Sequence, residues 1–171
     1  PQIMFRYMFD KQHVLMLRYR GRSSEPNIED LQQVIDQTNP LNIKYGNPNL
    51  KPSFTHNVMM FYNKYIPEYM RSYSMNLFYT NTRNDVANQT SYDPKTGGTV
   101  SRRVNVNGNW NARGYFSFNT PLKNRKFTIS SNTNAQYRDQ VSYTSVDKKV
   151  DVPQESELST THSLLLGERL T

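Results

Sequence analysis

The chain has 171 residues, enough for one ordinary domain, but only 35% of them are hydrophobic and the mean hydropathy is -0.83. That is thin for a soluble core, yet aromatic residues make up 12%, too many for a disordered segment of this polarity. The net charge of +7 comes from Lys and Arg spread without a run, so we expect solvated charge and no nucleic-acid partner. The lack of cysteine excludes disulfides, thiol catalysis and thiolate metal sites, and no apolar run approaches the roughly 18 residues of a membrane helix.

The first half of the chain predicts four strands, over residues 2–9, 13–21, 54–64 and 71–85. The fourth is the clearest, because apolar side chains alternate with polar ones along it. A long connection, residues 22–53, separates the second strand from the third. Within it, apolar residues at helical spacing predict one short surface helix near residues 26–35, followed by Asn, Gly and Pro turn formers.

The second half begins with a polar loop, predicted over residues 84–98. One strand is then predicted from about residue 99 to 118, because alternation persists from Val104 to Phe118. Such a strand exceeds the usual length in soluble proteins, about 5–6 residues. A further strand over residues 126–143, a loop over 144–158 and the start of a last strand at 159 complete the pattern.

The predicted connections run short, long, short, long, short, long along the chain. Short turns at one end and long loops at the other are typical of outer-membrane barrels. We therefore predict an all-β fold, an antiparallel up-and-down transmembrane β-barrel segment of about seven long strands. A bacterial barrel needs at least about eight strands, and both ends look cut, so residues 1–171 are interpreted as a partial barrel domain of a longer chain.

The alternation also predicts which side chains face lipid and which face the interior of the barrel. The expected membrane-facing residues, including the aromatic girdles, are Tyr73, Met75, Leu77, Tyr79, Trp110, Phe116, Phe118, Phe127 and Tyr137. The expected lumen-facing residues are Asn105, Asn107, Asn109, Asn111 and Arg113. The alternative at this point is that the aromatic residues pack the core of a soluble sandwich.

Two segments resemble a known family. The string Asn39-Pro40-Leu41 followed by Gly46-Asn47-Pro48-Asn49-Leu50-Lys51-Pro52, and then a strand, resembles TonB-dependent outer-membrane receptors of the kind common in Bacteroidetes-type bacteria. In that family the string usually continues with Glu, where this chain has Ser53. Residues 107–122 also resemble the barrel wall of that group, and the resemblance extends from about Tyr19 to Tyr137.

The resemblance implies the C-terminal part of a 22-stranded barrel whose plug domain lies upstream of this chain. It further implies coupling through TonB to the proton-motive force, and a loop formed by Gly46, Asn47, Pro48, Leu50, Lys51 and Pro52 at the outer end. The expected partners are outer-membrane lipid, the plug, TonB and a surface lipoprotein, and the expected location is the bacterial outer membrane.

No motif for chemistry stands out. His13, His56 and His162 lack metal-ligand spacing, and there is no nucleophile elbow or phosphate-binding loop. We therefore expect no enzyme activity, no metal and no cofactor. The predicted function is part of the wall and outer loops of a receptor for energised nutrient uptake. The alternatives are a barrel scaffold that does not transport, and a soluble all-β ligand-binding module.

Overall fold

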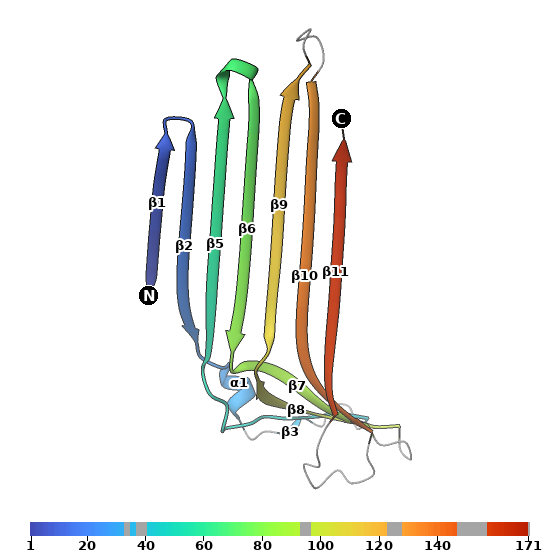
Figure 1. The fold of residues 1–171 in the computed structure, drawn as a ribbon. Coiled ribbons are helices and arrows are strands. Elements are labelled where there is room, and N and C mark those ends of the chain that lie inside the picture. Colours follow the sequence, from blue (N-terminus) through green and yellow to red (C-terminus); the bar gives the residue numbers. More distant parts are fainter. Residues whose placement is uncertain (33–34, 37–40, 93–96, 123–127, 147–156, 171) are drawn as a thin grey trace.

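Seven long strands stand side by side in one sheet (Figure 1). The computed structural model describes residues 1–32, 35–36, 41–92, 97–122, 128–146 and 157–170. The long strands are, in spatial order, β1 (Gln2–Asp10), β2 (His13–Ser24), β5 (Ser53–Ile66), β6 (Arg71–Arg83), β9 (Asn109–Pro121), β10 (Thr128–Val146) and β11 (Glu157–Leu170). Each pairs antiparallel with the next. The predicted all-β antiparallel fold with about seven long strands is confirmed.

The two ends of this wall differ, as predicted from the connections. Short connections join β1 to β2, β5 to β6 and β9 to β10 at the upper end of Figure 1, which we call the turn end. Between β5 and β6 the chain turns through the 3-10 helix η1 (Pro67–Tyr69) and through Met70, whose φ is 47°. The longer connections lie at the opposite end, the loop end.

The loop end carries the shorter elements: α1 (Ile28–Leu31), β3 (Ile35–Asp36), β4 (Asn42–Tyr45), β7 (Asp85–Tyr92) and β8 (Thr99–Val106). β7 pairs antiparallel with β8, and β8 pairs parallel with β4. The group joins the wall where β7 pairs parallel with the last four residues of β10. The predicted surface helix is present but spans four residues only. In the described part of the chain, no helix is long and apolar enough to cross a membrane.

Two predictions for the middle of the chain are wrong. Residues 84–98 do not form a simple loop, because 85–92 are strand β7. The residues of β7 are mostly polar, so they show no alternation of apolar and polar side chains. The strand forms because its backbone N–H and C=O groups pair with those of β8. The single strand expected over residues 99–118 is two strands, since the chain breaks at Asn107 and at Gly108, whose φ is 108°. A break of two residues preserves the alternation, so the pattern conceals it.

The sheet has two faces of different character. Residues paired across an antiparallel ladder lie on the same face, so the register assigns each side chain to a face. The apolar face holds the odd-numbered residues of β1, β2, β6 and β10 and the even-numbered residues of β5 and β9. The polar face holds the others. Among described residues, the only buried apolar side chains are Leu50, Val106 and Val141, all at the loop end, so the wall has no core of its own.

Candidate functional site

The centre of the apolar face is a continuous band of uncharged side chains. One cross-strand row consists of Leu17, Met60, Leu77, Gly114 and Ala135. The neighbouring row toward the turn end consists of Leu15, Tyr62, Met75, Phe116 and Thr133. Leu77 and Phe116 are 42% and 41% exposed, although they lie in the middle of the sheet. Large apolar side chains exposed in such a contiguous patch mark a surface that meets something other than water.

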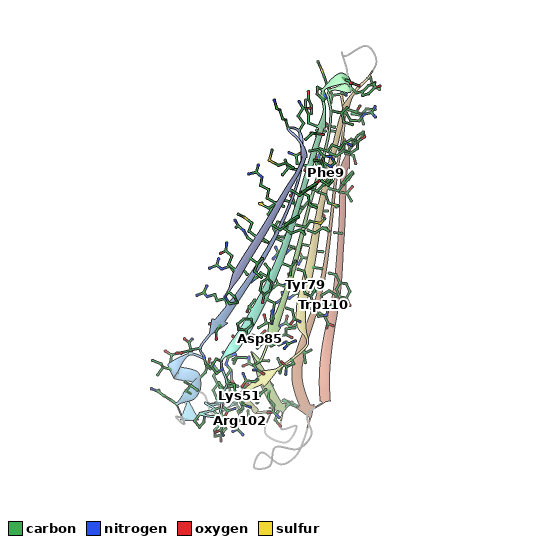
Figure 2. The ribbon with its side chains drawn as sticks, turned by 60° about the vertical axis from the view of Figure 1, so that its left-hand side comes forward. Phe9, Lys51, Tyr79, Asp85, Arg102 and Trp110 are labelled. Atoms are coloured by element: carbon green, nitrogen blue, oxygen red, sulfur yellow. The ribbon has the colours of Figure 1, made fainter. Side chains whose placement is uncertain are left out.

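Aromatic residues border this band at both ends. Toward the turn end, the rings of Tyr73 and Phe118 are 5.0 Å apart. Toward the loop end, the ring centroid of Trp110 is 5.9 Å from that of Tyr79 (Figure 2) and 4.8 Å from that of Tyr137. Two aromatic borders around an apolar band are the arrangement found where a barrel wall crosses the two membrane interfaces.

Charged residues of the apolar face lie outside the band. On β6, Arg71 and Arg83 are the first and last residues, and five uncharged residues of the same face separate them. Twelve residues correspond to about 40 Å along a strand, and a tilt of about 40° reduces this to about 30 Å of height. That height accommodates an apolar band of about 25 Å together with its borders.

The polar face differs because it carries arginines beside an aromatic cluster. Among the wall side chains that the structure describes, six arginines lie on it: Arg6 of β1, Arg18, Arg20 and Arg22 of β2, Arg113 of β9 and Arg138 of β10. Between them the rings of Phe61 and Phe78 meet edge to face at 5.6 Å, and Phe78 meets Tyr115 in the same way at 6.1 Å. A hollow of about 310 Å³ opens beside Phe78.

The asparagines expected to line a lumen divide between two regions. Asn111 and Arg113 lie on the polar face of β9, whereas Asn105 is on β8. The Asn105 side chain donates to the carbonyls of Lys51 and Asn84, at 3.0 and 2.8 Å, and accepts from the Lys51 N–H at 2.8 Å. It therefore joins two connections of the loop end. The role of these residues in lining a lumen stays a prediction.

Asn107 and Asn109 have similar local partners. The Asn107 side chain accepts from the N–H of Asn84, whose φ is 51°, at 2.8 Å. The Asn109 amide donates to the Asp85 carboxylate at 2.6 Å and accepts from the Val141 N–H at 2.7 Å. These bonds hold the break between β8 and β9 against β7 and β10.

The loop of residues 46–52 is packed closely against its surroundings. A Cβ at Gly46 would lie 1.7 Å from the carbonyl oxygen of Gln32, so only glycine fits there. The Asn47 side chain is buried, donates to the Arg103 carbonyl at 2.9 Å and accepts from the Asn49 N–H at 3.0 Å. Leu50 is buried as well. Close packing and hydrogen bonding thus explain why this loop has glycine at 46, asparagine at 47 and leucine at 50.

A polar cavity of about 590 Å³ lies next to this loop. Residues of both charges line it, including Glu29, Asp30, Lys44, Arg102 and Arg103. Arg103 donates to the Asp30 carboxylate at 3.0 Å, and both side chains of this ion pair are partly exposed to water. Figure 2 shows Lys51, Asp85 and Arg102 gathered at this end of the molecule. In the described part of the chain, no group of three or more His, Cys, Asp or Glu is arranged to hold a metal ion.

The register also shows how the predicted membrane-facing residues are distributed. Eight of the nine lie together on the apolar face: Tyr73, Met75, Leu77, Tyr79, Trp110, Phe116, Phe118 and Tyr137. Phe127 lies outside the described residues. Apart from Arg113, sequence reasoning missed the arginines and the aromatic cluster of the polar face. The alternation of β2, which puts Arg18, Arg20 and Arg22 on one face, offered the signal for three of these arginines. Contact of the apolar face with lipid stays a prediction.

A wall of long antiparallel strands, with an apolar face whose central band is uncharged and bordered by aromatic residues, defines an outer-membrane β-barrel protein. A family model described as the outer membrane protein beta-barrel family matches residues 1–171, so the chain belongs to this family. Its location is the bacterial outer membrane, and its environment is the lipid of that membrane. Comparison with curated proteins and with solved structures found no match.

Proposed function

We propose that these 171 residues form part of the barrel wall and outer loops of a receptor for energised nutrient uptake. The apolar face then meets lipid and the polar face lines the interior. The observation that carries this proposal is the uncharged run of apolar-face residues on β6 between Arg71 and Arg83, whose height of about 30 Å matches the hydrocarbon core of a bilayer. A soluble module would leave this face in water.

In this proposal the loop end lies outside the cell. The Gly46–Pro52 loop, which resembles that of TonB-dependent receptors of Bacteroidetes-type bacteria, supports the finer assignment. The loop closes one side of the polar cavity, which is open to ligands arriving from outside. The whole receptor would include a plug and would engage TonB and a surface lipoprotein. Its role is transport without catalysis, and it requires no cofactor.

The test uses the native polypeptide that contains this chain, extracted from membranes with detergent. We expect an intact mass several times 20.0 kDa and capture of the protein by the purified periplasmic domain of TonB. A large protein that does not bind TonB would instead be a barrel scaffold without transport. A mass near 20.0 kDa in the soluble fraction would contradict the membrane assignment itself.

A further inference from the structure

The polar face of the wall has an excess of positive charge. Arg18 and Arg113 share one cross-strand row, with Met59 and Phe78 between them. Three strand spacings separate these arginines, about 14 Å between Cα atoms. The next row toward the loop end has Arg20 at one side and Arg138 at the other. The arginines therefore surround a central area of the face.

Along the four strands from β2 to β9, no carboxylate balances this charge. The sequences of β2, β5, β6 and β9 contain no Asp or Glu. Among the β10 residues whose side chains the structure describes, Asp139 is the one carboxylate, and it lies on the apolar face. Within the described residues, Arg103 and Asp30 at the loop end form an ion pair at 3.0 Å, and no arginine of the wall has a carboxylate within 4.0 Å. Excess positive charge on a concave protein surface concentrates anions there.

The area between the arginines is hollow and partly aromatic. The cavity of about 310 Å³ is lined by Phe78, Tyr115 and Met59 together with the polar residues Asn57, Thr80, Asn111 and Arg113. Binding pockets for small molecules begin at about 300 Å³ and combine apolar walls with a few polar groups.

We propose that this hollow binds an anion with an aromatic or apolar body. Arg113, which lines the hollow, holds the carboxylate, phosphate or sulfate group, which a guanidinium binds in bidentate geometry. Arg18, Arg20 and Arg138 add to the positive potential around it. Phe78 and Tyr115 hold the apolar body. The inference rests on the proposed function, because it requires the polar face to line the interior of the barrel.

The test is charge-selective labelling in the full-length protein in outer membranes. The 171 residues contain no cysteine, so Thr80→Cys places a reporter at the hollow, and Ala112→Cys is the matched control on the apolar face. Any cysteines elsewhere in the full chain are first replaced. The reagents are two methanethiosulfonates, the anionic sulfonatoethyl and the cationic trimethylammonioethyl compound, used at low salt. The modification rate with each reagent is divided by the rate at which that reagent modifies free cysteine.

We expect the anionic reagent to modify Thr80→Cys at least 10-fold faster than the cationic reagent. Arg18→Gln combined with Arg113→Gln should remove most of this preference, and high salt should reduce it. Phenyl phosphate should protect the reporter at lower concentrations than either inorganic phosphate or phenol, because only phenyl phosphate has both parts of the ligand.

Each other outcome has a distinct meaning. Equal rates for the two reagents would overturn the anion site while leaving the barrel assignment intact. A preference without protection by phenyl phosphate would overturn the binding of an aromatic anion. If Ala112→Cys reacts and Thr80→Cys does not, the faces are reversed and the proposed function fails together with this inference.

Discussion

Leu77 allows the sharpest test of which face meets lipid. It lies six residues from Arg71 and six from Arg83, so about 15 Å of membrane height separates it from each. An arginine at this depth cannot bring its guanidinium to either interface. Leu77→Arg should therefore cost about 2–4 kcal/mol of folding free energy, the range for the bilayer midplane. That cost corresponds to a roughly 30- to 700-fold change in the folding equilibrium.

The control is the next residue of the same strand. Asn76 lies on the polar face beside Phe61 and Tyr115, so Asn76→Arg should cost less than about 1 kcal/mol. The assay is reversible urea unfolding of the full-length protein in lipid vesicles, followed by the mobility of the folded form on gels. The same comparison applies to Met75 and Asn111. Equal costs at the two faces would refute the assignment, and a larger cost at Asn76 would reverse it.

Three further predictions concern the loop end and the aromatic border. Gly46→Ala should destabilise the loop end by about 1–3 kcal/mol, because its methyl group meets the Gln32 backbone, and faster proteolysis within residues 22–53 would report this. Asn105→Ala should cost about 1 kcal/mol by leaving Lys51 and Asn84 without its bonds, and an unchanged proteolysis rate would contradict the role of that side chain. Trp110 lies about 10 Å from the midplane, so lipids brominated near the headgroup should quench its fluorescence more strongly than lipids brominated at the chain ends. Any Trp elsewhere in the full-length protein is first replaced by Phe.

The wall strands could be predicted from the sequence because the two faces of the sheet differ in polarity. The face of Met75 and Leu77 is apolar and the face of Ser74 and Asn76 is polar, so a period of two residues appears in the sequence itself. The same cause allowed eight of the nine predicted membrane-facing residues to be assigned to one sheet face. The alternation of short and long connections could also be predicted, because turns are formed by residues that are neighbours in the sequence.

The loop end could not be predicted in this way, because long-range contacts form it. The β7 strand reads as a polar loop and becomes a strand only by pairing with β8 and with the end of β10, about 50 residues further along the chain. The string Gly46–Pro52 is visible in the sequence, but the contacts that require these residues are not. Gly46 is required by the backbone of Gln32, and Lys51 is held by the side chain of Asn105. The hollow on the polar face likewise combines β5, β6 and β9. Alternation along one strand determines what a side chain faces, whereas only the register between strands decides which side chains meet.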